Sequence, residues 1–357
     1  MKLIIQIPCY DEATQLPGTL ADLPREVPGI DSVEWLVIDD GSTDETVEVA
    51  RANGVDHIVR LTNNKGLAAA FQAGLDACLK LGADVIVNTD ADNQYVGGDI
   101  PKLLAPILEG RADMVVGNRE TDRIEHFSPV KKLLQRWGSA VVRRASGTTV
   151  PDTTSGFRAY NREAALQMQV VSKFTYTLET IIQAGKVLVA VDHVPIRTNE
   201  KTRESRLFPS MWAYVRRNAV SIFRVYSLYE PLRVFMIAAG IVALPSAVIW
   251  ARFLWFFFNG QGDGHIQSLI LASTLMIIAV QFVALGVIAD IIAASRTTQQ
   301  QTLQRVRRIE LALGVAPSHY EPASEESARR ATTGAASGPA TGKAEGQAGA
   351  DRETVGA

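Results

Sequence analysis

The sequence predicts an α/β domain with a mostly parallel sheet, followed by an interfacial amphipathic helix and two transmembrane helices. Three observations predict this order. Over roughly the first two hundred residues, short apolar runs typical of strands alternate with helical patterns, which implies right-handed crossovers between parallel strands. Two later apolar runs are each long enough to cross a hydrocarbon core of about 30 Å. The end of the chain is low in complexity, and we expect it to be disordered.

The composition excludes several classes of protein. The chain has 357 residues, 47% of them hydrophobic, and a formal net charge of −2, a balance that indicates neither a nucleic-acid partner nor general disorder. Its two cysteines, Cys9 and Cys78, lie in apolar segments and are too few for a disulfide framework, so we expect both to be buried. The first apolar run ends at Pro8 and is too short for a signal peptide.

The first part of the chain is a series of strands whose ends carry polar residues. A turn rich in acids follows the second strand, where Ser42 or Thr43 can cap the next helix, and the fourth strand leads to Asp90. Since ligands of parallel sheets bind beyond the carboxyl ends of the strands, we expect these loops to open on one crevice. The expected strands are Leu3 to Ile7, Glu34 to Ile38, His57 to Arg60, Ala83 to Val87 and Met114 to Arg119.

Asp90 and Asp92 form the candidate metal site. If the extended conformation continues past the fourth strand, the two side chains face the same way, and hard carboxylate oxygens suit Mg²⁺ or Mn²⁺. An isolated pair of this kind is more often a simple polar loop. The chain, however, has neither a Gly-x-Gly-x-x-Gly after its first strand nor a Gly-x-x-x-x-Gly-Lys-Ser/Thr motif. A metal bridge is then the other way to neutralise a diphosphate.

Four motifs together resemble the inverting glycosyltransferases of family 2, which have the Rossmann-like GT-A fold. They are Ile7-Pro8-Cys9-Tyr10-Asp11-Glu12, Val37-Ile38-Asp39-Asp40-Gly41-Ser42-Thr43-Asp44, Asn64-Lys65-Gly66 and Thr89-Asp90-Ala91-Asp92. The resemblance implies a metal-dependent enzyme in which Asp90 and Asp92 hold Mg²⁺ or Mn²⁺ on the donor diphosphate, while Asp40 supports the pocket structurally. It also implies a set of residues that bind the nucleotide sugar: Pro8, Tyr10, Glu12, Asp39, Lys65, Ala91 and Gln94.

The next segments are similar to those of dolichyl-phosphate mannose synthase and the bacterial polyprenyl-phosphate glucosyltransferases. They are Met114 to Arg119, Asp152 to Tyr160 and the basic loop Arg203-Glu204-Ser205-Arg206-Leu207, which departs at two positions from the Gly-x-Ser-Lys-Leu of those relatives. Positive charge is needed twice, because a diphosphate leaves and a lipid phosphate attacks, so we assign Arg119, Ser155 and Arg158 to the acceptor phosphate or the sugar. Arg203 and Arg206 then close over the donor diphosphate, although a solvated loop or contact with anionic lipid headgroups is an equal alternative.

A general base is dispensable for such an acceptor. A phosphate monoester has a second pKa of about 6 and already presents an anionic oxygen near pH 7. If a base exists, Asp152 is the first candidate and Glu179 the second; either could instead orient Arg158 or a loop. Catalysis would then depend on Asp90, Asp92, Arg119 and Arg158 through positioning and charge.

The second half of the chain predicts attachment to a membrane. Basic and aromatic residues alternate with apolar ones at helical spacing in 130–144 and again in 207–226, the composition of interfacial helices. Val234 to Phe258 and Ile266 to Ala289 are the predicted transmembrane helices. The link between them lacks Lys and Arg, whereas arginines flank the other ends, so the positive-inside rule predicts a cytoplasmic catalytic domain and C-terminus in a multi-pass protein of the plasma membrane.

Together these features predict the inverting transfer of a hexose from UDP-glucose, GDP-mannose or a UDP-N-acetylhexosamine to undecaprenyl, decaprenyl or dolichyl phosphate. The alternatives are a processive polysaccharide synthase, for which Gln135-Arg136-Trp137 has the wrong spacing, and a non-catalytic membrane scaffold. The C-terminal helix could mediate self-association into a homo-oligomer. The predicted regions are a catalytic domain (1–205), an interfacial helix (206–232), a two-helix transmembrane region (233–295), an amphipathic helix (296–314) and a disordered tail (315–357).

Overall fold

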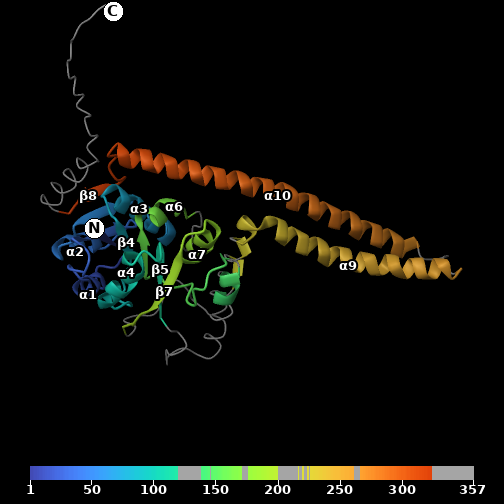
Figure 1. The fold of residues 1–357 in the computed structure, drawn as a ribbon, viewed down its shortest axis with the longest axis horizontal. Helices are drawn as coiled ribbons and strands as arrows, with labels where there is room; N and C mark the ends of the chain where they lie inside the picture. The colour runs from blue at the N-terminus through green and yellow to red at the C-terminus, as the bar shows by residue number, and fades with distance from the viewer. Residues whose placement is uncertain are drawn as a thin grey trace, which may run out of the picture.

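A sheet domain carries two long helices that project away from it side by side in this computed structural model (Figure 1). The structure describes residues 1–119, 138–144, 146–170, 176–199, 216, 219–220, 223–224, 226–260 and 266–323. We call residues 1–199 the sheet domain, and β8 (Tyr320–Pro322), from later in the chain, completes its sheet. Its eight-stranded sheet has the order β7-β5-β6-β4-β1-β2-β3-β8.

Most neighbouring strands of this sheet run parallel, which confirms the predicted mostly parallel α/β fold. β1 pairs in parallel with β2 and β4, β2 with β3, and β5 with β7, whereas β6 and β8 are antiparallel to their neighbours. The strands are β1 (Lys2–Cys9), β2 (Ser32–Asp39), β3 (His57–Arg60), β4 (Val85–Asn88), β5 (Met114–Asn118), β6 (Arg158–Asn161), β7 (Val191–Pro195) and β8 (Tyr320–Pro322).

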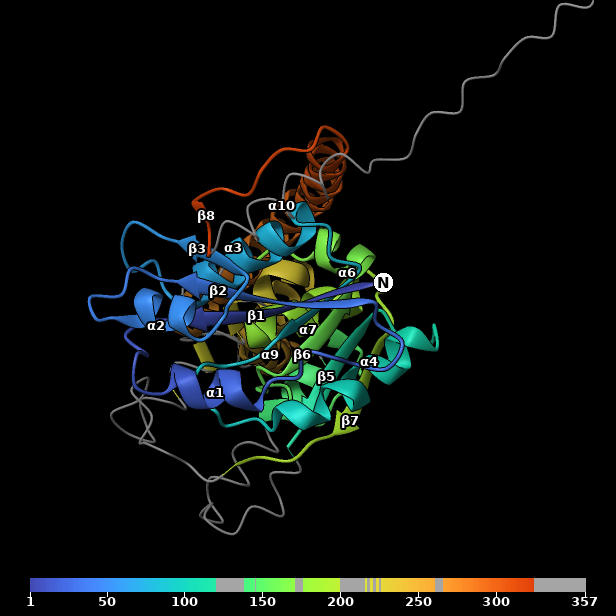
Figure 2. The same ribbon diagram turned by 90° about the vertical axis from the view of Figure 1, so that its left-hand side faces the viewer.

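Helices cover both faces of the sheet, and each face has its own apolar core (Figure 2). Alternate residues of β1 point to opposite cores: Ile4 packs with α3, α6 and α7, while Ile5 packs with α1, α2 and α4. Cys9 and Cys78 are buried free thiols, as predicted. The helices are α1 (Leu16–Asp22), α2 (Thr46–Ala52), α3 (Leu67–Lys80), the 3₁₀ turn η1 (Gly97–Asp99), α4 (Ile100–Leu108), α6 (Arg162–Gln167) and α7 (Thr177–Lys186).

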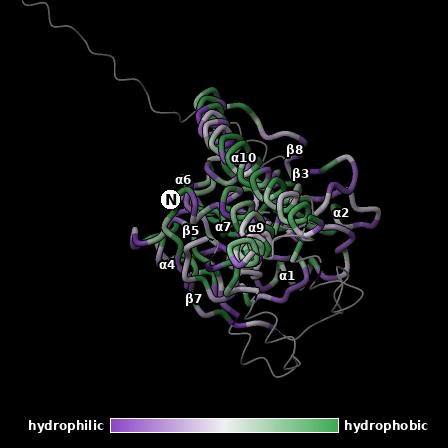
Figure 3. Tube along the Cα trace, turned by 90° about the vertical axis from the view of Figure 1, so that its right-hand side faces the viewer, coloured by the Kyte–Doolittle hydropathy of each residue, from purple (hydrophilic) through white to green (hydrophobic). Residues whose placement is uncertain are grey.

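The two long helices, α9 (Pro231–Phe258) and α10 (Ile266–Ala312), are long and apolar enough to cross a membrane. Their most apolar windows have mean hydropathies of 2.2 and 2.5, and only 11% of each window is buried inside the protein. In Figure 3, α9 and the adjoining part of α10 are largely green, the colour of hydrophobic residues. Mostly exposed apolar side chains are unlike those of the core helix of a soluble protein, so both helices are candidate membrane spans.

The C-terminal part of α10 differs from the separate amphipathic helix expected at 296–314. The helix continues without a break into this region, because no Gly or Pro occurs between residues 290 and 312. Its end packs on the sheet domain: Arg307 donates to the carbonyl oxygens of Leu166 and Met168, at 3.0 and 2.9 Å, and Arg308 pairs with Glu163. The apolar part of α10 and the sheet domain are therefore joined by one continuous helix.

The edge strand β8 lies within the tail for which we expected disorder. It pairs antiparallel with β3, whose outer edge would otherwise leave backbone hydrogen-bonding groups unpaired. The Tyr320 hydroxyl lies 2.9 Å from Nδ1 of buried His57, and Arg51 pairs with Glu321 at 2.7 Å. Residues beyond 323 are outside the described part of the chain. So is most of the expected interfacial segment at 206–232, of which residues 226–229 are helical.

Candidate active site

The loops after β1, β2 and β4 lie at one edge of the sheet, as the sequence predicted. The parallel register places Cys9 beside Asp39 and Gln6 beside Asn88. Because all three strands point the same way, their polar C-terminal loops converge.

Asp39 and Asp40 end β2 and have different roles. Asp40 accepts hydrogen bonds from the backbone N–H groups of Lys65 and Gly66, both at 2.8 Å, so it joins two loops and has the structural role that we expected. Burial and nearby Asp39 raise the pKa of Asp40. Asp39 is fully buried, and its Oδ1 accepts from the N–H of Ser42 at 2.9 Å.

Gly41 allows this turn to form. Its φ is +73°, and a Cβ there would lie 2.6 Å from the carbonyl carbon of Asn63. Ser42 and Thr43 do not cap α2; the Ser42 hydroxyl instead accepts from the N–H of Asp11 at 2.9 Å. Tyr10 stays 40% exposed beside this loop, whereas Glu12 is buried.

Asp90 and Asp92 lie in a turn rather than in an extension of β4. Thr19 donates its hydroxyl to the carbonyl oxygen of Ala91 at 2.8 Å, and the N–H of Gln94 donates to Oδ1 of Asp92 at 3.1 Å. Asn93 supports the turn with a positive φ of 53°, a conformation that asparagine tolerates. The turn replaces the alternation of an extended strand, yet the two carboxyl groups still lie close enough to interact.

The electrostatics of Asp90 reflect this closeness. Burial and the neighbouring charge of Asp92 raise the pKa of Asp90 to about 7, while Arg119 and a hydrogen bond with Tyr95 oppose the shift. Two carboxylates that repel each other in a partly desolvated loop form a site that favours a cation. Among the described residues, no third His, Cys, Asp or Glu completes a metal cage around them.

Asp90 rests against the backbone of Gly156. A Cβ at position 156 would lie 2.9 Å from Oδ1 of Asp90 and 2.8 Å from the Tyr176 hydroxyl. The Gly156 N–H donates to the Tyr95 hydroxyl at 2.9 Å, and its carbonyl oxygen accepts from Nδ2 of Asn88, also at 2.9 Å. These contacts connect the Asp90 loop to the segment that precedes β6.

Sequence reasoning missed Asn88, Tyr95, Gly156 and Tyr176. Tyr95 stacks on Phe157 with ring centroids 5.1 Å apart, and Asn88 also donates to the Tyr176 hydroxyl at 2.8 Å. Gly156 lies inside a segment that we singled out and Asn88 directly before one, but their contacts depend on residues far away in the sequence.

Arg119 and Asp152 form a two-pronged ion pair at the same edge. Nε and Nη2 of Arg119 donate to the two Asp152 oxygens at 2.7 and 3.0 Å, and Nη2 also donates to the Thr154 hydroxyl at 2.8 Å. Burial alone would raise the pKa of Asp152, but the Arg119 guanidinium lowers it below its usual value. Asp152 is thus an ionised partner that orients Arg119.

Arg158 lies inside the protein rather than in the crevice. It is fully buried, and its guanidinium donates to the carbonyl oxygens of Ser155 and Thr153 and to the hydroxyl of Thr180, at 2.6 to 3.0 Å. The Ser155 side chain is buried as well. These contacts make Arg158 a support of the loop, and direct contact of either residue with a phosphate stays a prediction.

Arg203 and Arg206 lie outside the described residues. The chain that leads toward them is anchored at the turn that follows β4 and contains Asp90 and Asp92. Tyr95 pairs with Thr198, the N–H of Asn199 donates to the carbonyl oxygen of Gln94 at 2.9 Å, and Nδ2 of Asn199 donates to that of Asn93 at 3.0 Å. Lys65 is exposed on its loop, and the second base candidate, Glu179, is buried in α7.

Comparison with known proteins agrees with this arrangement. The sequence model of Glycosyl transferase family 2 matches residues 4–168. The chain is 33% identical to a dolichyl-phosphate hexose transferase of Haloferax volcanii, over 58% of this chain and 87% of that protein. It is 28% identical to an undecaprenyl-phosphate mannosyltransferase of Micrococcus luteus, over 56% and 85%.

A solved structure shows the same fold. Glucosyl-3-phosphoglycerate synthase from Mycobacterium tuberculosis, in complex with Mn²⁺, UDP-glucose and phosphoglyceric acid, superposes with a TM-score of 0.51. The match covers 63% of this chain and 80% of that one, at 20% sequence identity. The chain therefore belongs to glycosyltransferase family 2, and its sheet domain is the GT-A catalytic domain of a glycosyltransferase.

Proposed function

We propose that this enzyme transfers a hexose from a nucleotide sugar to polyprenyl phosphate, with inversion, at the cytoplasmic face of the plasma membrane. The observation that carries the proposal is the presence of opposite charges at one edge of the sheet. The Arg119 guanidinium is close enough to Asp90 to oppose the rise of its pKa, and Asp92 lies close enough to raise it. Asp90 and Asp92 would hold a metal ion on the donor diphosphate, and Arg119 would bind the acceptor phosphate.

The residues present fit a divalent metal on the donor side. Mg²⁺ is commonly held by one or two carboxylates together with substrate phosphates, and Asp90 and Asp92 supply that number. Their mutual repulsion leaves a negative site that a cation would relieve. Mg²⁺ or Mn²⁺ bound there would neutralise the leaving diphosphate. The Asp90 and Asp92 carboxylates would hold this metal, and contact with the Gly156 backbone would keep Asp90 in place.

The loops after β1 and β2 are assigned to the nucleotide. Tyr10 exposes enough of its ring for a base to stack on it, and Asp39 is buried beside Arg60, whose Nε lies 3.5 Å from its Oδ2. The Asp39 carboxylate would accept a hydrogen bond from the base or ribose. Pro8 lies near the end of β1, and Glu12 and Lys65 lie on the loops that follow β1 and β3. The donor remains UDP-glucose, GDP-mannose or a UDP-N-acetylhexosamine.

The acceptor side needs positive charge more than it needs a base. Arg119 is oriented by Asp152 and would meet the acceptor phosphate, which already carries an anionic oxygen at neutral pH. Since Asp152 is ionised and bonded to Arg119, it serves to position Arg119. The anchored segment at Asn199 supports delivery of Arg203 and Arg206 to the donor diphosphate. Negative charge develops on the leaving diphosphate in the transition state. These cations would stabilise that charge and so favour departure of the nucleotide.

Two long apolar helices and the lipid-phosphate relatives support the membrane location. α9 and α10 would place the crevice near the surface that presents polyprenyl phosphate. Arg224, Arg233 and Arg296 flank the ends of these helices nearest the catalytic domain, which supports a cytoplasmic orientation.

A panel of donors tests the reaction. Membranes containing the enzyme are incubated with polyprenyl phosphate, Mn²⁺ or Mg²⁺ and one radiolabelled donor at a time: UDP-glucose, GDP-mannose or a UDP-N-acetylhexosamine. We expect one donor to label the lipid phase, and chelation of the metal to abolish labelling. If no donor labels the lipid while the enzyme is folded and membrane-bound, the proposed reaction is wrong.

A further inference from the structure

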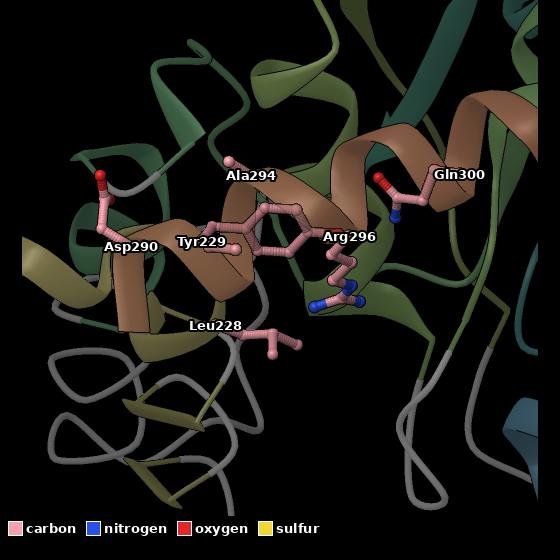
Figure 4. A pocket seen from close by; sticks show the side chains of 7 residues that line it. Leu228, Tyr229, Asp290, Ala294, Arg296 and Gln300 are labelled. Carbon is pink, nitrogen blue, oxygen red and sulfur yellow. The ribbon is translucent and has the colours of Figure 1, made fainter. Parts of the chain in front are cut away.

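A cavity of about 190 Å³ lies where the long helices meet the catalytic domain (Figure 4). One side is formed by Leu228 and Tyr229, just before α9, and the other by a face of α10 that runs from Asp290 to Gln300. Tyr229 also packs against the core of the catalytic domain. The lining contains no residue from the strand-end loops, so this cavity is distinct from the donor site.

Donors that make no well-formed hydrogen bond line this cavity. Both terminal nitrogens of Arg296 are buried without a hydrogen bond, and so are Nε2 of Gln300 and the Tyr229 hydroxyl, which interact with each other. The nearest carboxylate oxygen, on Glu179, is 3.9 Å from Nη2 of Arg296, too far for a hydrogen bond. A buried donor without a hydrogen bond is unfavourable, so such a group calls for a ligand that accepts hydrogen bonds.

The donors match an oxygen anion. The Arg296 guanidinium and the Gln300 amide nitrogen can only donate, and the guanidinium fork suits two oxygens of one phosphate. The guanidinium carbon also lies 5.0 Å from the centre of the Tyr229 ring, which holds the cation at the cavity wall.

The cavity lies at the level where a lipid headgroup would be. The apolar part of α10 ends at Ala294, two residues before Arg296, and α9 begins at Pro231, two residues after Tyr229. Given the proposed membrane insertion, Tyr229 and Arg296 fall at the boundary between hydrocarbon and water, where aromatic and basic side chains contact headgroups.

The volume limits the ligand. It is smaller than the roughly 300–1,000 Å³ of pockets for whole small molecules, and a phosphate group fits in it. We propose that this cavity binds the phosphate of a membrane lipid, held by Arg296, Gln300 and Tyr229.

Lipid binding by the full chain in detergent, followed by native mass spectrometry, tests the proposal. The chain is titrated separately with phosphatidylglycerol, polyprenyl phosphate and inorganic phosphate. We expect Arg296→Gln to weaken binding of a phosphate lipid tenfold or more, and Gln300→Leu to weaken it severalfold. The matched control is Arg308→Gln, on the same helix but outside the cavity, which should bind like the wild type.

The lipid whose binding is weakened in the cavity variants is the source of the phosphate. Weaker binding of either phosphatidylglycerol or polyprenyl phosphate supports the proposal. Wild-type lipid affinity in both cavity variants overturns it, as does inorganic phosphate that binds as tightly as the lipids. Thermal unfolding checks that each variant is folded. If Arg296→Gln does not fold, Gln300→Leu is used for the test instead. Because the readout is lipid binding, a failure of the proposed sugar transfer would leave this result intact.

Discussion

Gly156→Ala places one methyl group against the candidate metal site. The new Cβ would lie 2.9 and 3.0 Å from the two oxygens of Asp90 and 2.8 Å from the Tyr176 hydroxyl. Contacts below 3.0 Å force a neighbour to move. Both neighbours are held, because Tyr176 stacks on Phe71 with centroids 3.9 Å apart and Asp90 belongs to an anchored turn. We therefore expect the Asp90 carboxylate to be displaced.

The size of the effect follows from the cost of overpacking. An extra methyl group in a well-packed region costs about 1–3 kcal/mol. If that strain destabilises the metal-bound arrangement of Asp90, metal affinity and transfer rate drop about 5- to 150-fold. This range follows because roughly 1.4 kcal/mol changes an equilibrium constant tenfold. No φ strain adds to this cost, because the backbone of Gly156 is not in the left-handed region.

Initial transfer rates measured against Mn²⁺ concentration test this prediction. Gly156→Ala should need more Mn²⁺ for half-maximal activity, and excess metal should restore part of the rate. The control is Gly138→Ala, because none of the described residues lies within 4 Å of a Cβ at Gly138. A Gly156→Ala enzyme with the wild-type rate and metal dependence would refute the assignment of Asp90 to the metal.

Three further predictions address the metal pair, the ion pair and the contact of α10 with the sheet domain. Asp92→Asn should cut the transfer rate at least about a hundredfold in the labelling assay while thermal unfolding stays near that of the wild type. Asp152→Asn leaves Arg119 without its buried partner and should lower stability by about 3–5 kcal/mol at pH 7. Because the folded-state pKa of Asp152 is lowered, the stabilisation is present above its unfolded pKa of about 3.9 and is lost as pH falls, so the difference in thermal unfolding between the two proteins should shrink below about pH 4. Arg307→Ala removes two hydrogen bonds to the carbonyl oxygens after α6 and should lower stability by about 1.5–3 kcal/mol, seen as a lower unfolding temperature in detergent.

The sheet and its converging loops could be predicted because their signals are local. Apolar runs indicated β1, β2 and β4, and polar residues at the strand ends marked the crevice and the structural role of Asp40. The long helices were equally clear, since an apolar run of their length is typical of a membrane span. In each case neighbouring residues in the sequence carry the information.

Features that depend on distant contacts could not be predicted. The sequence predicted that Arg158 binds a phosphate. In the structure its guanidinium instead donates to three protein acceptors, one of them on α7. The support of Asp90 by Gly156 joins residues far apart in the chain. β8 needs the free edge of β3 to form, and a short run such as Tyr320–Pro322 carries no strand signal of its own. The helix cap at Ser42 was wrong because that hydroxyl accepts from Asp11 instead.

The lipid product of the purified enzyme tests the central claim most directly. The full chain in lipid nanodiscs is supplied with polyprenyl phosphate, Mn²⁺ and its preferred donor, and the product is analysed by mass spectrometry and NMR. We predict polyprenyl phosphate that carries a single hexose with the anomeric configuration opposite to that of the donor. A polymer, a retained configuration or an unmodified lipid would contradict the account.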